Sequence, residues 1–472
     1  MRIRCLWALI IWQALVVCPR QLSAMAQEPF IAQHEMDVDV LSSLRERLED
    51  LEEQNQAIQA ENARLLAAFE ESQVGAINAA PPVVPRSAPG EGITISMLNN
   101  TSQLKLGATL SALGTFSTSR PYSSSLPLFL FPESPTGQST NTFDLHARQS
   151  SFNARFTGSE VFGLTPGAEV LTLFFNDNIT DDNYGMLVYY AYGELKNEHM
   201  RFAAGLQRDI FNPVGPTVLP ISQLYGSGNA GSYRGQIRFE RFIEFDDRSQ
   251  LTLQAGLSNP ISTLVRDSVI DPLVEDNGWP NVEGRLALGL GEMEEYMGGR
   301  RQRPVEFGVS GIVGQLRISK PVPGPATPGP DRIINDIHAV GCDLQWAMTD
   351  RLGMKGEFFV GQALGEYNAG VLQNYNSDTF RPIRSKGAYG EVYCYLSPQL
   401  HVHCGYGIDD PVNTDLASGQ IESNQTSFNT LLWDLSKTVQ IGFEVDYRKT
   451  QYVSPLNDAE AVLLMTQFQW RF

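Results

Sequence analysis

Ala461-Val-Leu-Leu-Met-Thr-Gln-Phe-Gln-Trp-Arg-Phe472, the stretch that ends the chain, changes in character at every second position. Successive side chains of an extended strand point to opposite faces, so residues two apart share a face. One face would carry Val462, Leu464, Thr466, Phe468, Trp470 and Phe472, and the other Met465, Gln467, Gln469 and Arg471. The stretch therefore predicts a β-strand with one apolar, aromatic face.

A terminal phenylalanine with aromatic residues two and four positions before it is typical of the closing strand of an outer-membrane β-barrel. Such barrels carry girdles of aromatic residues at the membrane interfaces. We interpret Phe468, Trp470 and Phe472 as the signal read by the barrel-insertion machinery. The alternative is the edge strand of a soluble sandwich, and the chain upstream decides between the two.

The same alternation begins at Gln103 and recurs along the chain. Leu104, Leu106 and Leu110 would face one way, with Lys105 and Thr109 facing the other. Each segment has the length of about ten residues that a tilted strand needs to cross a bilayer. We therefore expect an all-β transmembrane barrel of about sixteen antiparallel strands, with fourteen or eighteen left open. The expected strands are 103–117, 142–157, 167–177, 186–195, 200–208, 232–243, 249–258, 281–291, 304–318, 336–348, 352–361, 386–396, 400–408, 426–435, 438–448 and 460–472.

The connections between these segments alternate between short and long. Examples are the short 196–199 followed by the long 209–231, and the short 349–351 followed by the long 362–385. Short periplasmic turns and longer outer loops are the topology of bacterial barrels, and an even strand count places both ends in the periplasm. A sandwich would have connections of more uniform length.

The beginning of the chain predicts a signal peptide over residues 1–26. Arg2 and Arg4 precede an apolar run that ends at Cys18, and Ala24-Met25-Ala26 supplies small residues for cleavage before Gln27. This run is shorter than the roughly 20 apolar residues of a membrane-spanning helix. Lipidation at Cys18 is an alternative, which Val17 disfavours because a small residue is expected there.

Composition is consistent with a barrel that encloses water. After residue 27 the chain offers no apolar run long enough for a spanning helix, which excludes a helical membrane protein. Only 19% of the residues are charged, while 41 of 472 are glycine. Cys342, Cys394 and Cys404 fall on expected strands at no disulfide or metal-site spacing, so we interpret them as small apolar residues.

Residues 36–72 predict a coiled coil. An a/d seam recurs every seven residues over four heptads, with Asn55 and Asn62 at a positions, where asparagine fixes register and strand number. A single charged helix is the alternative, but it would leave the leucines of the seam in water. A Pro/Ala-rich linker follows over 73–92, and the barrel is expected over 93–472.

Several short runs in this order resemble the DcaP-like porin family. They are Ala147-Arg148-Gln149-Ser150, Gly361-Gln362-Ala363-Leu364-Gly365, Gly405-Tyr406-Gly407-Ile408-Asp409-Asp410-Pro411 and Gly442-Phe443-Glu444-Val445 followed by Lys449-Thr450. The resemblance implies a signal peptide, a periplasmic coil and a trimeric sixteen-strand barrel for passive uptake of small, often anionic solutes such as aromatic carboxylates. The chain departs from the family in its proline-rich stretch 319–332.

Arginines recur at positions expected to face the lumen. If Tyr233, Ile237 and Phe239 face lipid, Arg234 and Arg238 point inward. The predicted pore-lining set is Arg148, Arg155, Arg201, Arg208, Arg234, Arg238, Glu240 and Arg285. Clustered guanidinium groups focus a positive potential, which predicts a preference for anions. Alternatively each arginine is paired with an inward acid, namely Glu169, Glu194, Glu240 or Glu283.

The connection 209–231 is the candidate constriction loop. It contains Asn212-Pro213-Val214-Gly215-Pro216 and begins at Asp209, beside Arg208. Porins fold a loop of this kind into the barrel, so we expect Asp209, Asn212 and Pro213 at the narrowest point. A plain surface loop is the alternative.

Other classes of protein receive less support. His401 and His403 would both point inward, and such a pair could bind a metal or serve hydrolysis, but no serine or acid motif accompanies it. We predict no catalytic residues, no metal site and no cofactor. A tether that joins the outer membrane to the cell wall through the coil is a second alternative.

The expected partners follow from this interpretation. They are outer-membrane lipid, the barrel-insertion machinery and two further copies of the chain, with peptidoglycan open as a partner of the coil and no nucleic acid. The expected location is the outer membrane of a diderm bacterium, with the coil in the periplasm.

Overall fold

The computed structural model describes residues 92–97, 101–138, 140–176, 183–262, 274–275, 278–320 and 331–472. The expected signal peptide, coiled coil and nearly all of the linker lie outside these residues. Within the described part of the chain, no helix is long and apolar enough to cross a membrane.

The described chain is mostly β-structure, as its period of two predicts. The long strands are β2 (Ser102–Ser117), β3 (Thr142–His146) with β4 (Ser151–Thr157), β5 (Thr165–Phe175), β6 (Tyr184–Lys196), β7 (Met200–Arg208), β8 (Tyr233–Asp246), β9 (Ser249–Ser258), β11 (Asn281–Leu290), β14 (Val305–Lys320), β15 (Asp331–Ala347), β16 (Leu352–Gln362), β17 (Arg384–Tyr395), β18 (Leu400–Pro411), β19 (Ile421–Asp434), β20 (Val439–Tyr452) and β21 (Ala459–Arg471). The shorter elements are β1 (Ile93–Met97), β10 (Val274–Glu275), β12 (Glu294–Tyr296), β13 (Arg300–Gln302) and the 3₁₀ turns η1 (Gly365–Tyr367), η2 (Gly370–Leu372) and η3 (Asn413–Asp415).

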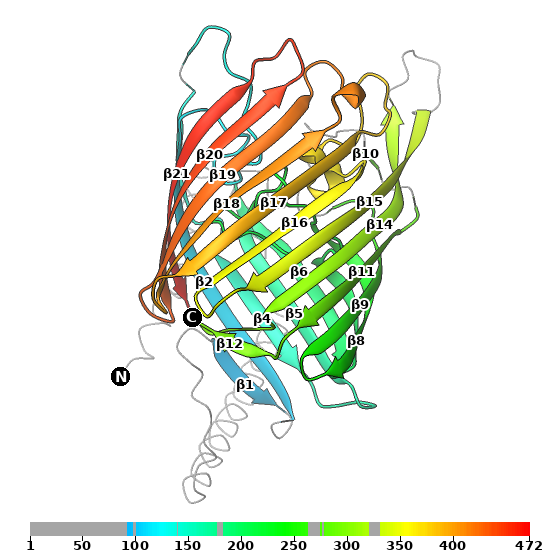
Figure 1. Cartoon of the computed structure of the whole chain (residues 1–472), viewed down its shortest axis with the longest axis vertical. Helices are drawn as coiled ribbons and strands as arrows, with labels where there is room; N and C mark the ends of the chain where they lie inside the picture. The colour runs from blue at the N-terminus through cyan, green and yellow to red at the C-terminus, as the bar shows by residue number, and fades with distance from the viewer. Residues whose placement is uncertain are drawn as a thin grey trace, which may run out of the picture. The chain divides into compact units, whose positions relative to one another are not determined.

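The long strands form one closed antiparallel barrel (Figure 1). The last strand, β21, closes it by pairing with β2, from Thr109 opposite Arg471 to Ser117 opposite Leu463. β3 and β4 occupy one position in the wall, which gives sixteen strand positions among the described residues. β1 pairs with the beginning of β2 and so continues the wall beyond the end of β21.

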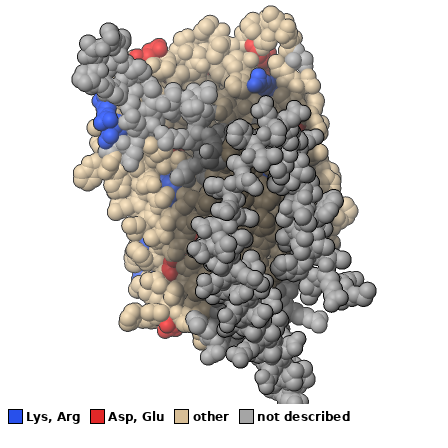
Figure 2. Space-filling view, turned by 180° about the vertical axis from the view of Figure 1, so that it is seen from behind, with Lys and Arg blue, Asp and Glu red and all other residues tan. Residues whose placement is uncertain are grey.

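Alternation along the strands separates an apolar outer face from a more polar inner face. On the outer face Phe468 is 41% exposed and Trp470 40%, whereas Met465 and Gln467 on the inner face are buried. Ile237 and Phe239 are exposed on the outer face, as expected. Figure 2 shows one side of the molecule, on which the described surface carries few Lys, Arg, Asp or Glu residues.

Tyr233 differs from the expectation that it faces outward. Its ring centroid lies 4.3 Å from that of Tyr189, and the ring stacks on Tyr190 at an interplanar angle of 16°. Both tyrosines belong to the group of aromatic and apolar residues inside the barrel. Tyr233 begins β8, so the alternation of that strand starts only after it.

The expected strand 142–157 is interrupted in the middle. Nδ1 of His146 accepts the backbone N–H of Arg148, and Oγ of Ser150 accepts the backbone N–H of Ser111 across the wall. Such side-chain bonds to the backbone compete with the regular ladder, which accounts for the break between β3 and β4. The connection between β11 and β14 contains the small hairpin of β12 and β13.

The hydrophobic core of the described chain lies inside the barrel, where three long connections fold inward. They are residues 118–141, 209–232 and 363–383. Leu126 and Leu128 from the first, Tyr225 from the second and Val371 and Leu372 from the third are buried in one cluster. The cluster also contains side chains of the wall, such as Phe175 and Tyr452. The three connections therefore fill part of the lumen and narrow it.

Candidate permeation pathway and constriction

The connection 209–232 follows the inner wall of the barrel and is held there by a row of carboxylates. Its backbone N–H groups donate to acids on strands far apart in the sequence. The pairs are Ile210 to Glu283 on β11 (2.8 Å), Val214 to Glu357 on β16 (2.6 Å), Thr217 to Glu391 on β17 (2.6 Å), Leu219 to Glu444 on β20 (2.6 Å) and Gly228 to Asp409 on β18 (2.8 Å). We call these five acids the carboxylate row.

The carboxylate row supplies hydrogen-bond acceptors to a chain segment that has no helix or strand to pair its backbone N–H groups. Buried backbone N–H groups need acceptors, and a carboxyl group offers two oxygen atoms that can accept several bonds. Glu283, for example, also accepts the N–H of Phe211 at 3.3 Å and the hydroxyl of Ser258 at 2.5 Å. Glu283 is therefore occupied by the loop, although the sequence suggested it as a partner for an arginine.

The residues expected at the constriction lie inside the barrel. Asn212 is fully buried in a left-handed conformation (φ 46°), and its backbone N–H lies 3.3 Å from Oγ of Ser310. Pro213 follows it and has no N–H that would need an acceptor. The bonded N–H groups of Asn212 and Val214 thus flank a residue that requires none.

Asp209 and Arg234 join the base of this loop to a second inward connection. The guanidinium of Arg234 donates to both carboxylate oxygens of Asp209, at 2.7 and 3.1 Å. It also donates to the carbonyl oxygen of Glu366 at 2.6 Å and lies 3.8 Å from the ring centroid of Tyr367. Arg234 points inward as expected, but it is completely buried. Its charge therefore holds the two loops together and does not reach the lumen solution.

Three other arginines of the predicted set are also in carboxylate pairs with little exposure. Arg238 and Arg201 share Oε1 of Glu240, at 3.3 and 3.1 Å. Arg285 pairs with Asp343 at 2.6 Å and with Glu306 at 2.8 Å. The buried part of the expected arginine ladder is thus neutralised by inward acids.

The remaining arginines of the set lie in different surroundings. Arg148, in the break between β3 and β4, pairs with Asp144. Arg208 donates to Gln223 of the constriction loop at 3.1 Å. Arg155 pairs with Glu169 at 2.8 Å, and its side chain is 61% exposed.

Arg155 stands on the side of the lumen formed by β2, β4, β5, β6 and β7, where two polar cavities open. One of ≈ 230 Å³ is lined by Arg155, Glu169, Tyr192, Glu194, Lys196 and Arg201. The other, of ≈ 350 Å³, is lined by residues that include Lys105, Asn153, Tyr190 and Arg471. We call this side the open wall, because the carboxylate row lies on other strands.

Tyrosines accompany these charges on the open wall. The hydroxyls of Tyr190 and Tyr192 donate to Glu169 at 3.1 and 2.9 Å. A β-bulge in β6 leaves Tyr189 without a partner residue in β5, and both Tyr189 and Tyr190 pack inside the barrel as a result. The sequence shows only three tyrosines among four residues and gives no sign of the bulge.

His401 and His403 point inward and touch each other, with Nδ1 of His401 2.7 Å from Nε2 of His403. Carboxylates lie at both ends of the pair, Glu391 at 2.6 Å from Nδ1 of His403 and Asp434 at 3.4 Å from Nε2 of His401. In the part of the chain that the structure describes, no group of three or more His, Cys, Asp or Glu side chains is arranged to hold a metal ion.

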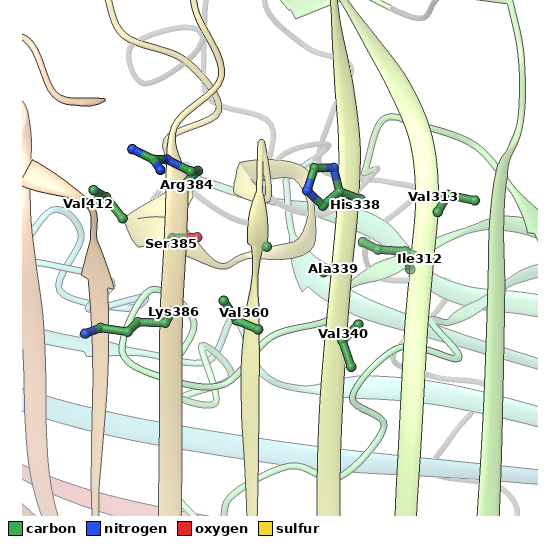
Figure 3. A pocket seen from close by; sticks show the side chains of 11 residues that line it. Ile312, Val313, His338, Ala339, Val340, Val360, Arg384, Ser385, Lys386 and Val412 are labelled. Carbon is green, nitrogen blue, oxygen red and sulfur yellow. The ribbon is translucent and has the colours of Figure 1, made fainter. Parts of the chain in front are cut away.

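A groove of ≈ 480 Å³ lies outside the lumen, on the outer face between β14 and β18 (Figure 3). Val313, Val340 and Val360 form its apolar part, and Arg384 lies near its rim. Arg384 donates to both oxygens of Asp415 in η3, at 2.7 and 2.8 Å, and holds the pKa of that carboxyl below its usual range. The groove lies on the outer face and is separate from the lumen.

The carboxylate row is the main feature that the predicted set of site residues lacks. Glu357, Glu391 and Glu444 each occupy an inward position on an alternating strand, flanked by outward apolar or small residues. That position could have identified them as lumen acids. Their backbone donors could not be found from the sequence, because they lie more than a hundred residues earlier.

No family model matches the chain, and no curated protein matches its sequence. Among solved structures, the outer-membrane channel DcaP of Acinetobacter baumannii matches with a TM-score of 0.58 and 13% identity, over 80% of this chain and 100% of that one. An anion-selective porin from Comamonas acidovorans matches with a TM-score of 0.49 and 11% identity, over 79% and 100% of the two chains. Salmonella typhi OmpF matches with a TM-score of 0.48 and 14% identity, over 80% and 100%. The match with DcaP establishes the fold, which is the sixteen-strand barrel that the resemblance to DcaP-like porins implied.

Proposed function

We propose that the protein is a porin of the outer membrane, a passive diffusion channel for small hydrophilic solutes. The observation that carries this proposal is the closed barrel whose lumen is narrowed by the connection 209–232 while an ionised open wall remains beside it. An inner face of this kind keeps water and dissolved ions in the lumen, whereas a loop held by buried carboxylates limits the size of what passes.

The outer face supports the location. Large apolar side chains such as Leu110, Val340, Phe443 and Leu464 are each between 45% and 54% exposed on it. A continuous exposed apolar surface is a liability in water but is expected where a barrel contacts lipid. The short turns would then face the periplasm together with the coiled coil expected over residues 36–72.

We further propose a preference for anions, set by the open wall. Arg155 and Lys196 have side chains that are 61% and 52% exposed, whereas their partners Glu169 and Glu194 are 12% and 11% exposed. A passing ion therefore meets the cationic member of each pair first. Arg234 and Arg285 contribute less, because they are buried in their ion pairs.

Measurement of single-channel conductance in a planar bilayer tests the proposal. We expect discrete conductance steps, and a reversal potential in a tenfold salt gradient whose sign indicates anion preference. A tether between membrane and cell wall would give no conductance. A conducting channel with cation preference would refute the role of the open wall while leaving the porin function intact.

We also propose that three copies of the chain assemble into a homotrimer. Barrels of this size commonly associate in threes, and the a/d seam of residues 36–72 would reinforce the assembly. The exposed apolar face offers ample surface for such contacts.

A further inference from the structure

Two histidines form the centre of a hydrogen-bonded chain on the inner face of β18. The chain runs from Asp434 through His401 and His403 to Glu391, with heavy-atom distances of 3.4, 2.7 and 2.6 Å. The two histidines are 7% and 5% exposed. The far end of this chain touches the constriction loop, because Glu391 also accepts the backbone N–H of Thr217 at 2.6 Å.

The protons of this chain can be counted from its partners. An ionised carboxylate only accepts, so His403 donates Nδ1–H to Glu391 and its Nε2 carries the lone pair. Neutral His401 then donates Nδ1–H to Nε2 of His403 across the 2.7 Å contact, which leaves the lone pair of its own Nε2 on the side of Asp434. One additional proton on that Nε2 converts the 3.4 Å contact into a charged hydrogen bond with Asp434.

We propose that His401 and His403 are a titratable selectivity element of the channel. The pair takes up a proton from the side of Asp434 as the pH falls, and the added charge increases the preference for anions. This inference rests on the proposed function as a diffusion channel.

A second proton cannot enter the chain without a change in geometry. Two facing N–H groups cannot both occupy a 2.7 Å gap, so the rings must move apart when both become imidazolium ions. Glu391 already lies 3.6 Å from Lys355, and Asp434 lies 3.9 Å from Arg471. The two carboxylates are thus balanced by these two cations, and the first added proton gives the group a net positive charge.

The groups that face the pair come from every element packed around it. They are Glu391, Tyr393 and Tyr395 on β17, Lys355 on β16 (3.6 Å from Glu391), Asp434 on β19, Arg471 on β21 (3.9 Å from Asp434), and Arg300 of the β12–β13 hairpin, over the rings of Tyr393 and Tyr395 at 4.5 and 4.6 Å. The ring of Tyr395 stacks on His401 with a centroid distance of 4.6 Å. Protons can reach the pair through Asp434, whose side chain is 30% exposed.

Reversal potentials at two pH values test the selectivity role. They would be measured in a tenfold salt gradient at about pH 7.5 and about pH 5.5, which span the usual titration of imidazole. We expect the ratio of anion to cation permeability to rise about twofold more in the wild type than in His401→Asn/His403→Asn, since one unit charge acts on passing ions through screened water. The matched control is His338→Asn on the outer face of β15, which should keep the wild-type response.

The outcomes separate the inference from the proposed function. An equal rise with acidification in the wild type and the double variant would overturn the inference, because lumen carboxylates would then account for it. A wild type that does not conduct at all would overturn the channel and the selectivity role together. A conducting wild type with a larger rise than the double variant supports the pair.

A measurement on the wild type alone keeps the inference testable if the double variant does not fold. Exchange of the histidine C2 hydrogens with deuterium, followed by mass spectrometry across pH, reports the titration of each ring. We expect His401 and His403 to titrate in two well-separated steps, because the first proton is bonded to Asp434 and the second is opposed. Independent titration of both rings at one ordinary midpoint would overturn the inference.

Discussion

Arg234 and Asp209 form an ion pair in which neither side chain is exposed to solvent, with Nε of Arg234 2.7 Å from Oδ1 of Asp209. A buried pair contributes little net stability, but removal of one partner leaves an uncompensated charge. Arg234→Ala should therefore lower the free energy of unfolding by about 3–5 kcal/mol and loosen the constriction loop. Thermal unfolding in detergent and limited proteolysis within residues 209–232 would measure both effects.

The double variant Arg234→Ala/Asp209→Ala is the matched control. It removes both charges, so it should be more stable than Arg234→Ala alone. Equal destabilisation by the single and double variants would show that Asp209 does not depend on Arg234.

A second prediction concerns the carboxylate row. Glu357→Ala/Glu444→Ala removes the acceptors of the N–H groups of Val214 and Leu219, each at a cost of about 1–3 kcal/mol. The loop should detach locally, so the single-channel conductance and its noise should increase. Glu357→Gln/Glu444→Gln keeps an acceptor oxygen at each site and should remain closer to the wild type.

Glu460→Ala is the control for the loss of an acid. Glu460 is exposed and bonded to Tyr447 and Lys449, away from the loop. Its removal should leave the conductance unchanged. The carboxylate row would lose its proposed role if the Glu357→Ala/Glu444→Ala channel behaved like Glu460→Ala.

A third prediction concerns ion selectivity. Arg155→Gln should lower the ratio of anion to cation permeability by about twofold, because an exposed charge on the open wall is removed. Reversal potentials in a tenfold salt gradient would show the change. An unaltered potential would mean that solutes do not pass along the open wall.

Ile237→Arg tests which face of β8 contacts lipid, because it adds a charge to the outer face instead of removing one from the lumen. Ile237 is 53% exposed on the outer face, and an arginine near the middle of the lipid-facing belt costs about 2–4 kcal/mol. We expect a lower yield of folded barrel with unchanged selectivity in the molecules that do fold. A full yield would place Ile237 outside the lipid-facing surface.

A fourth prediction concerns the last residue. The backbone N–H of Phe472 donates to the carbonyl oxygen of Ala108 at 2.9 Å, and the side chain is 58% exposed. Phe472→Asp keeps the backbone bond but removes the apolar terminus, so it should reduce the amount of protein in the outer membrane. Undiminished levels in fractionated membranes would count against the insertion signal.

A fifth prediction concerns assembly. A chain that begins at Gly92 retains every barrel strand but lacks the segment expected to form the coil. If barrel contacts hold the trimer, native mass measurement should still find three copies. Monomers would show that residues 36–72 alone determine assembly.

The period of two predicted the barrel because one physical condition acts on every strand. The outer face of each strand is apolar along its whole length, so the alternation begins and ends where the strand does. For this reason the expected bounds of β7 and β9 equal those in the structure. β5 does not follow the simple alternation, because Leu171, Leu173 and Phe175 are apolar and face inward, under the inward-folded connections. Their apolar partners in the lumen come from distant loops and leave no local pattern.

The lumen was harder to predict than the wall for the same reason. Inward arginines could be placed by the pleat, but their exposure depends on which acids and loops cover them. Arg155 and Arg234 look alike in the sequence, yet one is largely exposed and the other is fully buried. The bulge at Tyr189 and the break at Arg148 likewise depend on side-chain bonds and pairing across the sheet.

The bonds between the constriction loop and the carboxylate row depend on strands at increasing distance along the chain. Ile210, Val214, Thr217 and Leu219 meet acceptors that are 73, 143, 174 and 225 residues away. Each such contact closes a long stretch of chain, and the entropy cost of closure grows with the number of residues between the two partners. The last of these four bonds requires β20, the strand next to the end of the chain. The loop is thus held along its whole length only when β20 is in place, and a barrel without that strand would have a lumen that the loop narrows less.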